Sequence, residues 1–154
     1  MGNQSRHSKF ALSLSSGNKW DVRAQFAALC YKKAHGRVRV LLVTSRDTGR
    51  WVLPKGWPIA GLRPPECAEA EAWEEAGVRG KVENDCVGVF TYVKELDTGV
   101  GLPTVVAVFP LKVTSLEDTF PESGQRERQW VTLKRAAKLV DEPDLSDLLQ
   151  RFDP

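Results

Sequence analysis

Three glutamates in the segment "EAWEEA" have a spacing that could support chemistry: Glu71, Glu74 and Glu75. In a helix each residue advances about 100°, so positions i, i+3 and i+4 share one face. Two carboxylates about 4 Å apart repel by about 1 kcal/mol in water and about 4 kcal/mol near a protein surface. A hard divalent cation such as Mg²⁺ would relieve this repulsion and could bridge the carboxylates to phosphates. The spacing therefore indicates either a metal site or a solvated acidic face.

The residues around the glutamates favour the metal site. A loop rich in glycine and proline, residues 55–65, follows a predicted short strand over 51–54. Pro65 suits the first turn of a helix, where its missing N–H has no intrahelical partner, and Gly77 suits the position that ends one. We therefore predict a helix over 65–76 in a strand–loop–helix unit.

The other hydrophobic patterns predict an α/β (α+β) fold. Strands are predicted at 23–33, 38–45, 81–96, 103–113 and 127–133, and helices at 134–140 and 144–152. The segment 38–45 is nearly continuously apolar, which is typical of a central strand buried on both faces. Strands on both sides of one central helix, with helices at the end of the chain, predict an α/β/α sandwich with a mixed β-sheet between helices.

The strand–loop–helix segment resembles the Nudix box, G-xxxxx-E-xxxxxxx-R-E-U-x-E-E-x-G-U, where U is a bulky aliphatic residue. Gly56 opens the pattern, which closes at the required spacing with Glu71, Glu74, Glu75, Gly77 and Val78. The flanks "RWVLPKG" and "GQRERQWVTLKRAAKLV" most resemble the diphosphoinositol polyphosphate phosphohydrolase branch and its bacterial relatives. The resemblance implies a single Nudix hydrolase domain over 20–154 that hydrolyses a diphosphate linked to another moiety.

The resemblance also implies roles for the residues of the box. Glu71 and Glu75 are the expected metal ligands, the backbone carbonyl of Lys55 or Gly56 is a further one, and Glu74 is the expected base. Ligand and base can exchange roles between branches of the family, so the assignment among the three glutamates stays open. The expected cofactor is Mg²⁺, with Mn²⁺ as a substitute.

An anionic substrate needs cations that the acidic helix does not provide. The predicted substrate-binding residues lie on strand ends and loops around the box, namely Arg23, Ser45, Arg46, Arg50, Lys55, Arg126 and Arg128. Arg126 and Arg128 stand just before Trp130, where the similar phosphohydrolases carry phosphate-binding residues. The planar fork of arginine suits a highly phosphorylated ligand. Each arginine alone could equally be an ordinary surface residue.

Two charged residues of the box are missing. Leu62 stands where the pattern has its first glutamate, and Ala70 stands where it has arginine. Because an apolar pair can replace an ion pair at little net cost, we expect Leu62 to pack near Ala70. Prolines would then hold the loop, namely Pro58, Pro64 and Pro65.

Charge and composition narrow the partners and the compartment. A net charge of +2 on 22 basic and 20 acidic residues gives no global field that demands nucleic acid or a membrane. No long apolar run predicts a membrane span, and residues 1–9 lack the apolar core of a signal peptide, so we expect a cytoplasmic protein. Residues 1–19 are polar and serine-rich, which predicts a disordered tail.

The expected function is Mg²⁺-dependent cleavage of a diphosphate linkage in diphosphoinositol polyphosphates or dinucleoside polyphosphates. The alternatives are a Nudix hydrolase for nucleoside triphosphates, nucleotide sugars or RNA 5′-triphosphates, and a phosphate-binding module that has lost turnover. The expected partner is a phosphorylated small molecule, with no nucleic acid other than RNA 5′ ends and no membrane. No oligomeric state is predicted.

Overall fold

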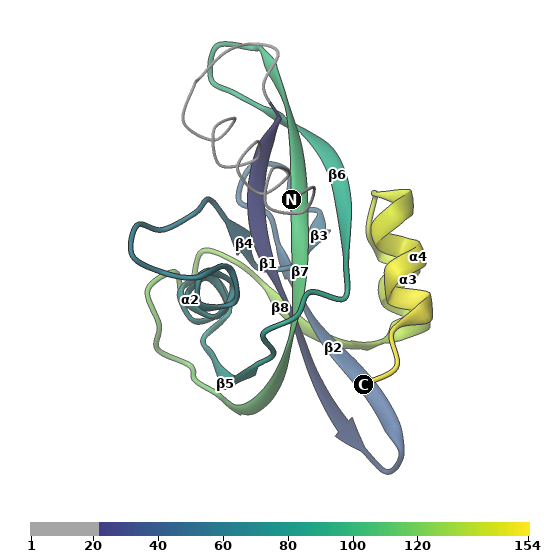
Figure 1. Cartoon of the computed structure of the whole chain (residues 1–154). Coiled ribbons are helices and arrows are strands. Elements are labelled where there is room, and N and C mark those ends of the chain that lie inside the picture. The colour runs from purple at the N-terminus through teal and green to yellow at the C-terminus, as the bar shows by residue number, and fades with distance from the viewer. Residues whose placement is uncertain (1–21) are drawn as a thin grey trace, which may run out of the picture.

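The computed structural model describes residues 22–154, which form a mixed sheet with helices on both faces (Figure 1). The strands are β1 (Arg23–Ala34), β2 (Arg37–Thr44), β3 (Trp51–Val52), β4 (Lys55–Gly56), β5 (Val78–Val82), β6 (Gly88–Glu95), β7 (Gly101–Leu116) and β8 (Arg128–Thr132). The helices are α2 (Pro64–Ala76), α3 (Leu133–Leu139) and α4 (Pro143–Arg151). No helix among these residues is long and apolar enough to cross a membrane. The tail expected over 1–19 lies outside the described residues.

Two long strands, β1 and β7, form the middle of the sheet. They run parallel, with Arg23 opposite Thr104 at one end and Tyr31 opposite Lys112 at the other. The other strand pairs in residues 22–154 are antiparallel. β2 lies next to β1 and also pairs with β3 and β8, and its residues 40–44 are all buried. The continuous apolar run of β2 therefore occupies the interior position that its sequence predicted.

The helices cover the two faces of the sheet as separate layers. α2 lies on one face, and α3 and α4 lie on the other (Figure 1). On the first face, Ala68, Ala72 and Ala76 of α2 are fully buried against the sheet. On the second face, Leu145 and Leu149 of α4 are buried in a separate core. This arrangement confirms the predicted α/β/α sandwich with a mixed sheet.

Local signals define both ends of α2. Arg63 precedes the helix, and its N–H donates to Glu66 Oε1 at 2.8 Å, while Pro64 and Pro65 fill the first helical positions. Gly77 ends the helix with a φ of 67°, a left-handed conformation that glycine adopts without strain. The prediction of a helix over 65–76 that stops at glycine was short by one residue at its start.

Two predictions about the strands were wrong in part. The segment 81–96 was expected as one strand, but it contains the end of β5, a bend at residues 84–85, and then β6. β5 and β6 pair with different parts of the same edge of β7. Asn84 and Asp85, which are turn formers, stand at the break, so the expectation of one strand passed over a local signal. The segment 55–65 was expected as a loop throughout, but it begins with β4, which pairs with β1 at Phe26 and Ala27.

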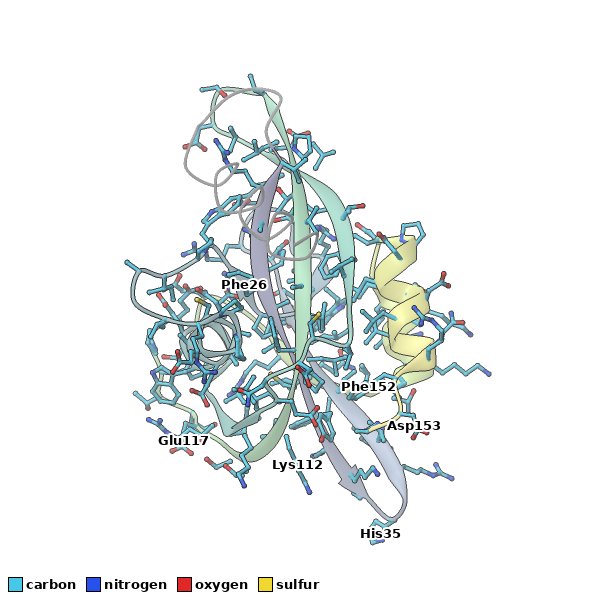
Figure 2. The ribbon with its side chains drawn as sticks, in the orientation of Figure 1. Phe26, His35, Lys112, Glu117, Phe152 and Asp153 are labelled. Carbon is cyan, nitrogen blue, oxygen red and sulfur yellow. The ribbon has the colours of Figure 1, made fainter. Side chains whose placement is uncertain are left out.

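The histidine and cysteines of the described chain lie where they do not form a catalytic cluster. His35 is at the tip of the hairpin between β1 and β2, away from α2 (Figure 2). Cys30 and Cys67 are buried, Cys86 is exposed, and all three are free thiols. The chemistry of the fold therefore centres on α2 and its surroundings.

Candidate active site

A cavity of about 410 Å³ lies beside the acidic face of α2. Its walls come from β1, the loop after β2, β4, β6 and the loop before β8. Seven residues predicted from the sequence line it: Ser45, Arg46, Lys55, Gly56, Glu71, Glu75 and Arg126. The fold thus brings the helix carboxylates and several predicted cations to one cavity, although they come from distant parts of the chain.

Glu71 and Glu75 form a carboxylate pair that is unfavourable when both are ionised. Glu75 is only 7% exposed, and its burial raises its pKa to about 7, against the effect of nearby Arg126. The pKa of Glu71 is also raised, first by burial and then by the charge of Glu74. In the absence of a bound cation, the two carboxyl groups therefore favour the protonated form more than ordinary glutamates do.

The backbone of β4 approaches this pair closely. The N–H of Lys55 lies 3.4 Å from Glu75 Oε1. A Cβ atom at Gly56 would overlap the carboxylate of Glu71, so any side chain here would force that carboxylate out of its present position. The requirement for glycine at the start of the box is therefore steric, and the strand edge lies against both glutamates where the sequence predicted a backbone ligand.

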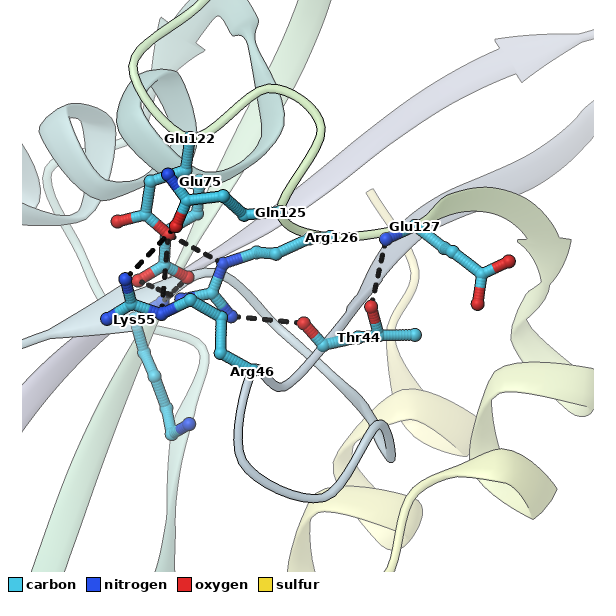
Figure 3. A network of polar contacts seen from close by, with 8 residues as sticks. All are labelled: Thr44, Arg46, Lys55, Glu75, Glu122, Gln125, Arg126 and Glu127. Atoms are coloured by element: carbon cyan, nitrogen blue, oxygen red, sulfur yellow. Dashed lines mark hydrogen bonds and ion pairs between the residues drawn. The ribbon is translucent and has the colours of Figure 1, made fainter.

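A buried ion-pair network faces the same carboxylates from the loop before β8 (Figure 3). Arg126 Nε donates to Glu122 Oε1 at 2.8 Å, and Arg126 Nη2 lies 3.6 Å from Glu75 Oε2. Arg126 Nη1 also donates to the carbonyl oxygen of Thr44 at 3.0 Å. The side chain of Arg126 is only 9% exposed. This predicted substrate ligand is therefore bound to protein groups on three sides.

Glu122 is a site residue that the sequence reasoning missed. It lines the cavity, and its charge raises the pKa values of Glu71 and Glu75. The available signal was an acid four residues before Arg126, but a single i, i+4 pair outside a periodic segment is weak evidence. The position of Glu122 depends on how its loop packs against α2.

Lys55 is a second, partly buried cation near the pair. Its pKa is lowered to about 8, primarily by burial, while the charge of Glu75 acts in the opposite direction. The ammonium lies 5.1 Å from the centre of the Tyr92 ring, and Tyr92 donates from its hydroxyl to Gln25 at 2.6 Å. Lys55 is therefore held in a pocket wall and is not a freely moving surface lysine.

The carboxylate pair fits a hard divalent cation. In residues 22–154, no three carboxylate, imidazole or thiol groups come close enough to enclose an ion by themselves. Mg²⁺ commonly binds proteins through only one or two carboxylates and takes water and substrate phosphates as its other ligands. Glu71 and Glu75 offer such a pair, and a cation there would offset the cost of ionising them.

Glu74 and Arg23 lie outside the cavity. The side chain of Glu74 is exposed, although its charge acts on Glu71. Arg23 lines a neighbouring hollow together with Trp57, which is also part of the cavity wall. Both residues are next to the cavity, and neither lines it.

Arg50 and Arg128 are occupied by other protein groups. Arg50 Nη1 donates to Glu142 Oε2 at 2.8 Å and lines a second hollow beside the cavity. Arg128 Nη1 donates to the carbonyl oxygens of Ala76 at 2.9 Å and Glu117 at 2.7 Å. The predicted cations therefore separate into those that line the cavity and those that hold the surrounding chain.

A sequence model of the family described as "NUDIX domain" matches residues 22–152. This chain belongs to the Nudix hydrolase family. It is 34% identical over 125 residues to Nudix hydrolase 21, chloroplastic, of Arabidopsis thaliana. The aligned region covers 79% of this chain and 61% of that protein. It is 30% identical over 116 residues to diphosphoinositol polyphosphate phosphohydrolase 3-alpha of Mus musculus, covering 74% of this chain and 66% of that protein. The chain therefore spans about three fifths of the length of the Arabidopsis relatives it matches.

Solved structures share the fold. A C. elegans Ap4A hydrolase binary complex superposes with a TM-score of 0.62 at 23% identity, covering 84% of this chain and 93% of that chain. The MutT protein from Methanosarcina mazei Go1 also gives a TM-score of 0.62, at 25% identity, covering 86% of this chain and 93% of that chain. These similarities confirm the Nudix fold inferred from the box and its flanks.

The two departures from the Nudix box lie on the back of α2, away from the cavity. Leu62 and Ala70 line the same hollow of about 420 Å³, but Leu62 is 41% exposed. Leu62 is therefore near Ala70, as expected, but their shared hollow is open to water on the Leu62 side. The box loop is held partly by its own hydrogen bonds, from Leu62 N–H to Ile59 O at 3.1 Å and from Ile59 N–H to Cys67 Sγ at 3.4 Å.

Restoring the two charged residues should therefore have a small effect on stability. Because Leu62 is exposed, Leu62→Glu should change the free energy of unfolding by about 0.5 kcal/mol or less. Adding Ala70→Arg should recover a coupling of about 0.2–1 kcal/mol, the usual range for an exposed ion pair. A double-mutant cycle by urea denaturation measures this coupling. A coupling well above that range would show that the pair is shielded from water.

The metal-free protein should lose stability as Glu75 ionises. Its pKa is raised from 4.5 to about 7 in the folded state, so the folded protein binds this proton more tightly than the unfolded chain. The resulting stabilisation is full below about pH 4.5 and is lost as the pH rises through about 7. Denaturation in chelator should therefore show Glu75→Gln gaining stability relative to wild type across this range. A constant difference between the two proteins from pH 4.5 to 7.5 would contradict the burial of the charge.

Proposed function

We propose that this chain is a Mg²⁺-dependent pyrophosphohydrolase that cleaves a diphosphate linkage in diphosphoinositol polyphosphates or dinucleoside polyphosphates. The observation that carries the proposal is the pair of the half-buried Glu71 and the buried Glu75 on one wall of a cavity whose other walls carry Arg46, Lys55 and Lys94. The carboxylates suit a divalent cation, and the cations suit phosphate oxygens. The names of the mouse phosphohydrolase and the C. elegans Ap4A hydrolase support the same two substrate classes.

In the proposed reaction, water attacks phosphorus and the anhydride P–O bond breaks, so one phosphate leaves with the electron pair of that bond. A bound Mg²⁺ would neutralise charge on the phosphate oxygens and orient the water. Glu71 and Glu75 would hold the ion, and the Lys55–Gly56 backbone would fix the carboxylates in place. Arg126 would keep Glu75 in position through the contact at 3.6 Å.

Two carboxylates are candidates for accepting the proton of the water. Glu74 is the candidate from the family resemblance, but its side chain is exposed and does not line the cavity. Glu122 lines the cavity and is bound to Arg126 at 2.8 Å. Comparing the pH dependence of single-turnover rates in Glu74→Gln and Glu122→Gln would distinguish them, because loss of the base removes the acidic limb of the profile.

Mg²⁺-dependent turnover should depend on Glu75. We expect Glu75→Gln to lower kcat by at least about a hundredfold, the low end for loss of a key charge-stabilising group. Glu69→Gln is the matched control, because Glu69 is exposed on the same helix and faces the hollow on its back. Phosphate or nucleotide release would be measured with an inositol pyrophosphate, a dinucleoside tetraphosphate and ATP, each with Mg²⁺ and with chelator. No Mg²⁺-dependent release from any of them would refute the proposal.

Exposed cavity cations should select substrates that are rich in phosphate. Arg46 is 56% exposed at its side chain, lies 3.9 Å from Glu122 and donates to Gln125 Oε1 at 3.2 Å, so it would exchange these exposed contacts for a ligand phosphate. Arg46→Gln and Lys94→Gln should therefore raise KM several-fold more for an inositol pyrophosphate than for ATP, because more phosphates lose a partner. Lys81→Gln, an exposed change on β5, is the control. Equal effects on both substrates would favour the nucleotide-directed alternative.

A further inference from the structure

The chain between β7 and β8 is fastened to the C-terminal end of α2. The N–H of Glu117 donates to Gly77 O at 2.9 Å, and the N–H of Glu122 donates to Glu74 O at 3.0 Å. We call residues 117–127 the clamp segment. The two hydrogen bonds to α2 use carbonyls at the end of the helix, where a helix leaves carbonyl groups without internal partners. The start of the clamp segment is therefore held by the end of the helix that carries Glu75. Its end is bonded to β2, where the Thr44 N–H donates to Glu127 O at 3.1 Å and the Glu127 N–H donates to Thr44 Oγ1 at 2.9 Å.

The side chain of Arg128 links α2 to the clamp segment. One of its terminal nitrogens donates both to Ala76 O at 2.9 Å and to Glu117 O at 2.7 Å, so a single side chain bridges the helix and the start of the clamp segment. α2 has no basic residue in its own last turn. The guanidinium of Arg128 supplies the positive charge that favours the carbonyl end of a helix.

An aromatic contact completes this joint. The guanidinium of Arg128 lies 4.9 Å from the centre of the Phe120 ring, and Phe120 is only 8% exposed. A Cβ atom at Gly77 would overlap the Phe120 ring and the carbonyl of Glu117. The glycine that ends α2 thus also admits the clamp segment. The further ion pair to Asp118, at 3.4 Å, involves a fully exposed carboxylate and adds little.

The clamp segment carries two of the groups that face the helix carboxylates (Figure 3). Glu122 and Arg126 are joined at 2.8 Å, and Arg126 reaches Glu75 at 3.6 Å. Movement of the segment relative to α2 would change both contacts at once. A displacement of about 1 Å from a change remote from the chemistry can cost about a hundredfold in rate.

We propose that Arg128 is a positioning residue for the active site, and that it holds Glu122 and Arg126 against Glu75 without contacting substrate. Its guanidinium does not line the cavity, and its donors are directed to the carbonyls of Ala76 and Glu117. This assignment differs from the phosphate-binding role expected from the sequence. Its effect on catalysis rests on the proposed hydrolase function, whereas its effect on the clamp segment does not.

The test compares Arg128→Gln, Arg128→Lys and Arg79→Gln. Arg79 is the matched control, since it stacks on Trp73 of the same helix at 3.9 Å but lies outside the clamp segment. Hydrogen exchange measured by NMR should become at least about tenfold faster at the Glu117 and Glu122 amides in Arg128→Gln. Lysine keeps a donor near the two carbonyls, so Arg128→Lys should restore most of the protection, and Arg79→Gln should leave it unchanged.

Kinetics and metal binding give the functional readout. In Arg128→Gln we expect kcat to fall by about tenfold or more and the Mg²⁺ concentration for half-maximal rate to rise, while KM stays within about twofold. The dissociation constant for Mn²⁺, measured by water-proton relaxation without substrate, should rise in parallel. Arg128→Lys should recover most of each loss.

Two outcomes would overturn the inference, and a third would refute the proposed function alone. A higher KM with unchanged kcat and unchanged amide exchange would make Arg128 a substrate ligand. A lower melting temperature with unchanged kcat, exchange and Mn²⁺ affinity would make it a structural residue only. If wild type shows no Mg²⁺-dependent hydrolysis, the proposed function fails, and the exchange rates and the Mn²⁺ affinity still decide whether Arg128 positions the site.

Discussion

The placing of the buried Glu75 beside the half-buried Glu71 is the constraint on which the rest of this site depends. The pKa values of Glu71 and Glu75 are raised first by burial, and then by neighbouring carboxylates, with Glu74 acting on Glu71 and Glu71 acting on Glu75. Neighbouring elements place donors and positive charge beside the two carboxylates. β4 presents the Lys55 N–H to Glu75, and the loop before β8 presents the Arg126 guanidinium. These contacts offset only part of the cost of ionising Glu71 and Glu75, so a bound cation would stabilise the ionised pair further.

The packing of α2 against the sheet fixes where that pair stands. The buried stripe of the helix consists of alanines such as Ala68, Ala72 and Ala76, which let the helix lie close to the strands. Glu71 and Glu75 lie beside this stripe and so face the edge of β4. Larger residues in the stripe would move the carboxylates away from Gly56, whose missing side chain leaves room for Glu71. The alanines of α2 and Gly56 of β4 therefore both allow the helix and its carboxylates to lie close to the sheet.

Features encoded by short-range patterns could be predicted from the sequence, and features created by distant contacts could not. The limits of α2, the apolar run of β2 and the acidic face of the box were readable because each has its own local signal. The break between β5 and β6 lets both pair with β7, and the turn formers Asn84 and Asp85 mark its place but not the pairing. Glu122 enters the site only because its segment is bonded to the end of α2. The place of Leu62 near Ala70 was predictable from the box, but its exposure of 41% was not, because residue type alone does not fix exposure in a loop.

The number of arginines near the Nudix box overstates how many can bind a substrate, because several of them already bind protein groups. Arg46 is largely exposed, Arg126 is bound to two carboxylates, and Arg128 donates to two backbone carbonyls. Among residues 22–154, four cationic side chains line the cavity together with four carboxylates. A polyanionic substrate would therefore meet a wall that is close to neutral, and Coulomb attraction from protein groups alone would be weak. A divalent cation on Glu71 and Glu75 would change that balance toward positive charge, which is the physical reason that the proposed reaction depends on metal.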